Sequence, residues 1–130
     1  MAGASTGHMR CIGKNWMLTM NNPGRLMIYV MNANRWDVEM WDGIESYDNE
    51  EKNKCRMQYI WESLECESSV GQLEQGDSGT YHYQIFVHFA NKVSGAEIRR
   101  RLGNMRSHIE KCLNVKASMD YCRKRYDFSL

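Results

Sequence analysis

His82 and Gln84, in the second half of the chain, are two side chains that could together hold a divalent metal ion. Alternate residues of an extended strand share one face of a sheet, so the two side chains would lie close together. Imidazole, amide and carboxylate groups suit Mn²⁺ or Mg²⁺, and Glu74, across a glycine-containing turn, is the best-placed carboxylate. The same spacing is also typical of the solvated side of a half-buried strand, so spacing alone does not decide.

Tyr121 and Lys124 form a second pair that could do chemistry. On a helix, residues three positions apart lie on one face, so both side chains would reach the same substrate. A tyrosine hydroxyl, with a pKa of about 10, is a poor nucleophile unless positive charge stabilises its oxyanion. A metal ion on the strand and a lysine one turn away would supply that charge. With seven tyrosines and 17 lysines and arginines in the chain, the pairing also fits chance.

The elements that must position these residues can be predicted from apolar periodicity and turn signals. We expect strands at 15–20, 70–73, 80–90 and 107–110, and helices at 57–64, 96–102 and in a final segment capped by Ser118. The run 26–31 fits a strand or a helix, and the acidic, irregular sequence 32–53 is expected to be a long insertion that is partly loop, with Trp36 and Trp41 as isolated anchors. This order predicts an α+β sandwich with a mainly antiparallel sheet.

The strand at 80–90 predicts two different faces. One should carry the core residues Tyr83, Ile85, Val87 and Phe89. The other should carry His82, Gln84, Phe86 and His88, of which His88 is expected to be structural or to face DNA.

Composition fits one domain. A chain of 130 residues with 42% apolar content can bury one modest core. No apolar run approaches the roughly 18 residues that a membrane span needs. Residues 1–13 are expected to be a flexible leader, part of it derived from a tag, and 14–130 the folded domain. The five cysteines are odd in number and lack CxxC spacing, which favours reduced thiols over zinc or disulfides.

Charge is distributed unevenly along the chain. Residues 91–130 contain 10 Lys and Arg against 4 Asp and Glu, a net charge of +6, whereas residues 1–90 have a net charge of −5. This asymmetry fits a surface that meets a polyanion, and it fits uneven solvated helix faces equally well.

Three segments resemble motifs of a known family, the Rep proteins of circular single-stranded DNA viruses such as circoviruses, nanoviruses and geminiviruses. Their nuclease domains are HUH endonucleases. The segments are WMLTMNNP at 16–23, GTYHYQ at 79–84 and YCRK at 121–124, and HIEK at 108–111 also matches a circovirus-like segment. Glutamine as the second metal-binding residue is the circovirus-like form. The resemblance covers about residues 14–127.

The resemblance implies a five-stranded, mainly antiparallel sheet with flanking helices, in the RRM-like or ferredoxin-like topology. It implies an endonuclease and strand transferase that nicks and rejoins single-stranded origin DNA at a stem-loop. Tyr121 would be the nucleophile, forming a covalent bond to the 5′ phosphate, and Lys124 would offset charge. His82, Gln84 and Glu74 would bind Mn²⁺ or Mg²⁺, with Glu67 as the alternative carboxylate.

The resemblance also implies partners and a place of action. Thr19, Asn21 and Asn22 of the first motif are candidate DNA contacts, although the two asparagines also fit a simple strand-ending turn. Four basic residues are candidate contacts to the DNA backbone, or a solvated surface: Arg99, Arg100, Arg101 and Arg106. The family acts in the host cell nucleus. No Gly-x-x-x-x-Gly-Lys-Ser/Thr occurs in the chain, so we expect a C-terminal helicase domain in a longer protein.

Three features depart from the family pattern. Ile85 stands where relatives usually have glycine, the stretch 24–71 is longer than in compact relatives, and the metal-binding glutamate is not aligned securely.

Two other functions compete with this interpretation. One is a non-catalytic RNA- or ssDNA-binding module, because Phe86 and Phe89 echo an RRM signature whose aromatics stack on bases. The other is a plasmid or transposon HUH nuclease.

Overall fold

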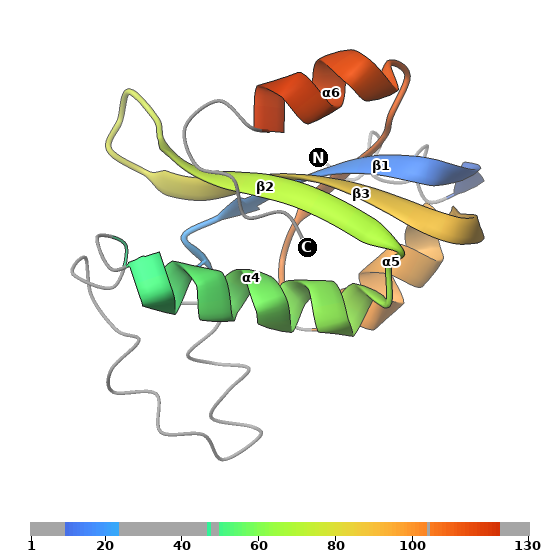
Figure 1. Cartoon of the computed structure of the whole chain (residues 1–130), viewed down its shortest axis with the longest axis horizontal. Helices are drawn as coiled ribbons and strands as arrows, with labels where there is room; N and C mark the ends of the chain where they lie inside the picture. The colour runs from blue at the N-terminus through green and yellow to red at the C-terminus, as the bar shows by residue number, and fades with distance from the viewer. Residues whose placement is uncertain (1–9, 24–46, 48–49, 104, 123–130) are drawn as a thin grey trace.

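The computed structural model describes residues 10–23, 47, 50–103 and 105–122. The expected order of strand, helix, strand, strand, helix, strand and helix is confirmed (Figure 1). The elements are β1 (Ile12–Asn21), α4 (Glu50–Leu64), β2 (Ser68–Gln75), β3 (Tyr81–Ser94), α5 (Gly95–Leu102), β4 (His108–Lys111) and α6 (Val115–Cys122). β1 begins inside the expected leader, with Ile12 paired to Ser94 of β3.

The strands form one antiparallel sheet in the order β2-β3-β1-β4. The α+β class is therefore confirmed. In the described part of the chain the sheet has four strands, where five were expected. The run 26–31, most of the segment 32–53 and its two tryptophans lie outside the described residues.

Helices cover both faces of the sheet (Figure 1). We call the face under α4 and α5 the core face, and the face under α6 the α6 face. The core face carries Tyr83, Ile85, Val87 and Phe89 of β3, all at most 2% exposed, as their alternation predicted. β1 adds Trp16, Leu18 and Met20, each fully buried. None of the described helices is long and apolar enough to cross a membrane.

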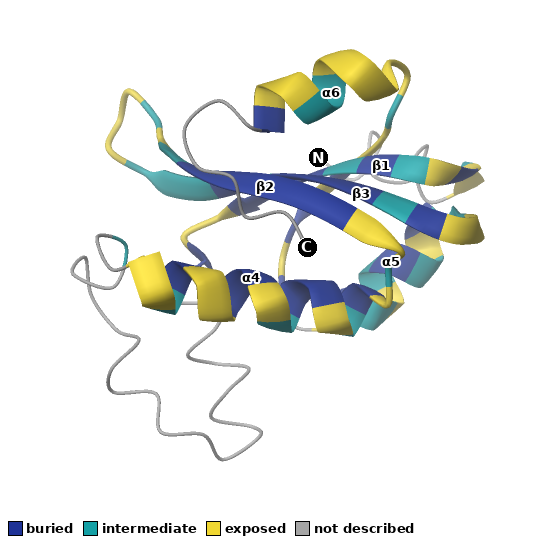
Figure 2. Ribbon diagram, viewed as in Figure 1, coloured by how far each residue is buried: buried dark blue, intermediate teal, exposed yellow. Residues whose placement is uncertain are grey.

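Helix α4 supplies the apolar layer that closes the core face (Figure 2). Met57, Ile60, Trp61 and Leu64 follow the spacing expected for one helical face, and all are buried. The helix expected at 57–64 begins earlier, at Glu50, inside the segment expected to be partly loop. Glu50 and Glu51 in the first turn favour this early start, since negative charge stabilises a helix N-terminus.

Helix α6 begins earlier than expected. The predicted cap, Ser118, lies inside the helix and accepts a hydrogen bond from the thiol of Cys112. Asn114 is the cap, because its side-chain oxygen accepts the backbone N–H of Ala117 at 3.0 Å. The earlier start gives α6 eight residues and places Tyr121 in its last turn.

Candidate active site

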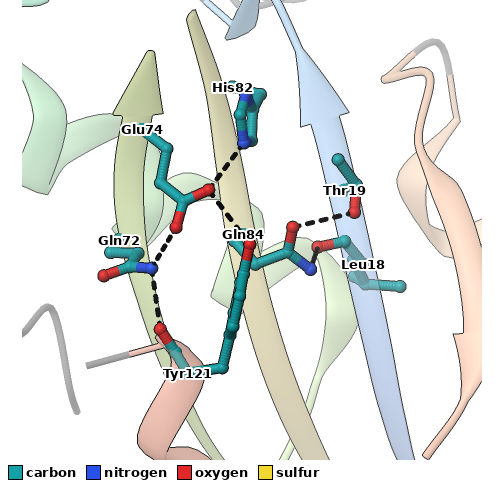
Figure 3. A network of polar contacts seen from close by, with 7 residues as sticks. All are labelled: Leu18, Thr19, Gln72, Glu74, His82, Gln84 and Tyr121. Carbon is teal, nitrogen blue, oxygen red and sulfur yellow. Dashed lines mark hydrogen bonds and ion pairs between the residues drawn. The ribbon is translucent and has the colours of Figure 1, made fainter. Parts of the chain in front are cut away.

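Polar side chains from three strands gather at one end of the α6 face (Figure 3). Strand register aligns them in two rows. Glu74 of β2 pairs with His82 of β3, which in turn pairs with Asn21 of β1. The next row runs through Gln72, Gln84, Thr19 and His108, one residue from each of the four strands.

Glu74 and His82 form the centre of this cluster. Glu74 Oε1 and His82 Nε2 are 2.8 Å apart, and each side chain is 18% exposed. The turn between β2 and β3 brings them together, because Gly76 N–H donates to the Thr80 carbonyl at 2.9 Å. Gly79 has a φ of 89°, which side-chain-bearing residues rarely adopt. The sequence-based choice of Glu74 as the neighbour of His82 therefore has a geometric basis.

Tyr121 reaches the cluster from α6, the helix that covers this face of the sheet. Its hydroxyl donates to Glu74 Oε1 at 3.3 Å, so phenol and imidazole meet at one carboxylate oxygen. The Tyr121 side chain remains 44% exposed, which leaves its ring open to a substrate. Partial burial raises the pKa of the Tyr121 hydroxyl, and the charge and hydrogen bond of Glu74 raise it further. Without a cation at the site, the phenol keeps its proton.

Cys122, beside Tyr121, has a different role. Its side chain is fully buried and packs with Val70 and Phe86 on the α6 face. Burial raises the pKa of the Cys122 thiol to about 12, with a smaller contribution from the Glu74 carboxylate. A neutral, buried thiol holds α6 to the sheet and does not compete with Tyr121 as a nucleophile.

Gln84 lies on the α6 face as its spacing predicted, and its amide points toward β1. Its Oε1 accepts the Thr19 hydroxyl at 3.1 Å, and its Nε2 donates to the Leu18 carbonyl at 3.5 Å. Thr19, a candidate DNA contact from the sequence, therefore orients the Gln84 amide.

Gln72 is a site residue that the sequence reasoning missed. It is fully buried, and its Nε2 donates both to Glu74 Oε2 and to the main-chain carbonyl of Tyr121, the latter at 2.7 Å. Its position two residues before Glu74 puts both on one face of β2, and this spacing was the available signal.

The donor set fits a divalent cation. Among the described residues, no three His, Cys, Asp or Glu side chains converge as a metal site, and the Gln84 amide is the candidate third ligand. The Glu74 carboxylate and His82 Nε2 already face each other at 2.8 Å. The Gln84 amide oxygen has two lone pairs, so its bond to Thr19 does not exhaust it. One carboxylate, one imidazole and one amide oxygen suit Mn²⁺ or Mg²⁺.

Glu67, the alternative carboxylate, immediately precedes β2 and lies beside the middle of β3, where its N–H donates to the His88 carbonyl. It is 3.2 Å from His88 Nε2, while His88 Nδ1 contacts Asn15 Oδ1 at 2.7 Å. His88 therefore takes part in a separate polar group, and Glu74 is the carboxylate found beside His82.

Asn21 and Asn22, the two asparagines of the first motif, have different structural positions. Asn21 ends β1 opposite His82, within the cluster. Asn22 has a φ of 50°, a left-handed conformation that asparagine tolerates, and its N–H donates to the Tyr81 carbonyl at 2.8 Å. Asn22 thus forms the turn, and Asn21 faces the site.

The arginines of α5 are not brought to this site, because α5 covers the core face (Figure 1). Arg100 and Arg101 both bind Glu97, and with Arg100 as the larger cause they lower the Glu97 pKa to about 2. Arg101 also donates to the Leu64 carbonyl at 2.8 Å.

The other two candidate arginines also lie outside this cluster of strand residues. Arg99 is half-buried in α5, and Arg106 is exposed in the connection from α5 to β4. Lys124 lies outside the described residues.

Comparison with known proteins identifies a family. A family model described as "Putative viral replication protein" matches residues 50–125, more than half of the chain. The matched segment runs from α4 through α6 and so contains Glu74, His82, Gln84 and Tyr121. No curated protein matches the chain significantly.

Proposed function

Because this chain belongs to the family of viral replication proteins, we propose that it nicks and rejoins single-stranded origin DNA in rolling-circle replication. The observation that carries the proposal is the meeting of a phenol and an imidazole at one carboxylate oxygen. Tyr121 Oη and His82 Nε2 lie 3.3 Å and 2.8 Å from Glu74 Oε1. An accessible hydroxyl beside residues that can hold a divalent cation is a typical arrangement for covalent catalysis at a phosphate.

The proposed reaction is a transesterification. The Tyr121 oxygen attacks the scissile phosphorus, and its proton passes to water, because Glu74 Oε1, the acceptor of its hydrogen bond, would hold the metal ion. The bond from phosphorus to the 3′ oxygen breaks, and that oxygen takes a proton to become a 3′ hydroxyl. Tyr121 stays linked to the 5′ phosphate. Because one phosphodiester replaces another, a later 3′ hydroxyl can reverse the step and join ends.

His82, Glu74 and Gln84 would hold the cofactor, Mn²⁺ or Mg²⁺. When bound, such an ion polarises a phosphate oxygen and offsets negative charge. Lys124, three residues beyond Tyr121 in the sequence, is proposed to offset charge on the phosphate or the leaving oxygen.

The DNA strand is proposed to cross the α6 face. Asn21 lies opposite His82 and is the best-placed residue for a contact beside the scissile phosphate. Thr19 and Asn22 would act through the Gln84 amide and the turn. The four arginines, remote from Tyr121 or exposed, remain candidates for flanking DNA. With the resemblance to Rep proteins, we propose action in the host nucleus together with a helicase domain.

A non-catalytic RRM-like module receives less support. Base stacking needs exposed aromatic rings on the sheet, whereas Phe86 on the α6 face is only 3% exposed. The viral family match also favours a viral protein over a plasmid or transposon nuclease.

The test incubates the protein with Mn²⁺ and stem-loop oligonucleotides whose loops are randomised. A 3′-end label should appear in a species of protein size that survives denaturation, and a 5′-end label in a shorter fragment with an extendable 3′ hydroxyl. Tyr121→Phe should abolish both products. Tyr59→Phe, which removes a hydroxyl from α4 on the opposite layer, is the matched control and should react like wild type. Absence of a wild-type adduct, or an adduct that persists in Tyr121→Phe, would contradict the proposal; in the second case Tyr126 is the next residue to test.

A further inference from the structure

Gln72 of β2 contacts two parts of the site, the Glu74 carboxylate and the last turn of α6. It occupies the middle of β2 and is fully buried, although its amide is strongly polar. A buried amide must use its hydrogen-bonding groups within the protein, because an unsatisfied one is costly. Gln72 directs one nitrogen to two acceptors, a carboxylate oxygen of Glu74 and the main-chain carbonyl of Tyr121 (Figure 3).

Apart from the hydrogen bonds at Gln72 and Glu74, the contact of α6 with the sheet is small and apolar. Of the eight residues of α6, only Cys122 is fully buried, and most of the helix surface is exposed (Figure 2). Cys122 packs with Val70 and Phe86, while Met17 and Met119 lie at the margin of the cluster. Apolar contacts hold a helix against a sheet, but they are non-directional and fix its rotation and register poorly. A hydrogen bond is directional, and the one from Gln72 ends on the nucleophile's own residue.

The second bond of Gln72 fixes the carboxylate. With Oε2 of Glu74 held by the Gln72 amide, Oε1 is turned toward His82 and the Tyr121 hydroxyl. The same nitrogen atom therefore sets the position of the carboxylate and of the helix turn that bears the nucleophile. Tyr121 Oη and Glu74 Oε1 stay 3.3 Å apart because both groups are tied to one point on β2.

We propose that Gln72 is the positioning residue that aligns Tyr121 with Glu74, and that its loss slows the cleavage step while leaving DNA binding intact. Gln72 lies beneath Tyr121 and Glu74 and acts on the reaction only through them. The inference rests on the proposed nuclease function. A misplacement of about 1 Å is enough to cost roughly 10²-fold in rate, so a change that leaves the fold intact should still be visible.

The experiment compares Gln72→Met with Gln75→Met. Methionine matches glutamine in length but donates no hydrogen bond. Gln75 lies three residues further along β2, is exposed and donates within the turn, to the Gly79 carbonyl, which makes it the control. We expect Gln72→Met to lower the single-turnover rate at saturating oligonucleotide by about 10²-fold. The dissociation constant for an uncleavable oligonucleotide should stay within about twofold, because Gln72 is buried and meets no DNA. Gln75→Met should leave both unchanged.

A second measurement, made without metal or DNA, accompanies the cleavage rates. Amide hydrogen exchange of α6 should become faster in Gln72→Met, because the helix loses its directional tie to the sheet. An unchanged cleavage rate would overturn the inference, and so would a loss of rate matched by an equal loss of DNA affinity.

If Gln72→Met does not fold, NMR of the wild-type protein tests whether the hydrogen bond from Gln72 to Tyr121 exists in solution. The Gln72 side-chain amide should exchange slowly and show a scalar coupling to the Tyr121 carbonyl carbon, and absence of that coupling overturns the inference. A wild type that forms no adduct would refute the nuclease function; a wild type that forms it while Gln72→Met reacts as fast refutes only the role of Gln72.

Discussion

The two faces of the sheet differ in what their side chains do. The core face, closed by α4 and α5, carries Tyr83, Ile85 and Val87 of β3, all fully buried. The α6 face carries His82 and Gln84 of the same strand, half-buried and in polar contacts. Since successive residues of a strand point to opposite faces, one strand contributes to the core and to the site at once. Substitutions at neighbouring positions should therefore separate folding from chemistry.

The largest effect, on the rate of adduct formation, is expected for one of two carboxylates that contact histidines of β3. Glu74→Gln should lower the rate of adduct formation by about 10³-fold, because it removes the one carboxylate among the proposed metal ligands, which is also the acceptor of the Tyr121 hydrogen bond. Glu67→Gln removes the same charge beside His88 and should change the rate by no more than about twofold, because that pair is more exposed. Gel quantification of the adduct over time measures both. A larger loss in Glu67→Gln would move the site to His88, in the middle of β3.

A second comparison concerns the free energy of unfolding at two adjacent residues of β3 that lie on opposite faces of the sheet. Ile85→Ala should lower the free energy of unfolding by about 2–5 kcal/mol, because it opens a cavity in the core. Gln84→Ala should lower it by about 1 kcal/mol, through two lost hydrogen bonds at a half-buried position. Urea unfolding followed by circular dichroism gives both values. Equal destabilisation by the two variants would remove the distinction between the faces.

Two tyrosines with hydrogen-bonded hydroxyls provide a smaller test. Tyr83→Phe removes a buried bond to Asn53 Oδ1 of 2.7 Å and should lower the free energy of unfolding by about 1–2 kcal/mol. Adduct formation should remain, because Tyr83 belongs to the core face. Tyr121→Phe should show the reverse pattern, full stability and no adduct. If Tyr83→Phe abolished the adduct in folded protein, the core face would have a role in chemistry that this account does not give it.

The smallest effect concerns the proton of Tyr121. The folded protein raises the pKa of this phenol above its ordinary value of about 10, first through burial and then through Glu74. The associated stability is therefore present below about pH 10 and is lost as pH rises through the folded pKa. Glu74→Gln removes the negative charge and should lower the Tyr121 pKa in metal-free protein. The difference in ultraviolet titration between each protein and its Tyr121→Phe form isolates this residue. No decrease in pKa would argue against the contact.

Local patterns predicted much of the fold. Alternation along 80–90 identified both faces of β3, and the turn at 75–79 led to Glu74 as the neighbour of His82. Spacing in 57–64 predicted the buried face of α4, but its first turn was missed, because Asn53 and Arg56 are polar residues on the buried side. Their burial depends on contacts outside α4, with Tyr47 six residues before Asn53 and with Tyr83 thirty residues after it.

The remainder of the site depends on long-range packing. β2 is buried on both faces from Ser69 to Leu73, so alternation did not mark Gln72 as facing the site, and its two-residue spacing from Glu74 was the one signal. Its partner Tyr121 is 49 residues away, and only the docking of α6 joins them. The basic cluster of α5 likewise gave no indication of which face it would cover, because charge along the sequence does not determine the layer.

The most direct test of the central claim is to map the covalent bond. Wild-type protein is reacted with a cleavable stem-loop oligonucleotide, digested with nuclease and protease, and the nucleotide-bearing peptide is sequenced by tandem mass spectrometry. The account predicts a single phosphodiester remnant on Tyr121. A remnant on any other residue, or DNA cleaved by the protein with no remnant at all, would contradict it.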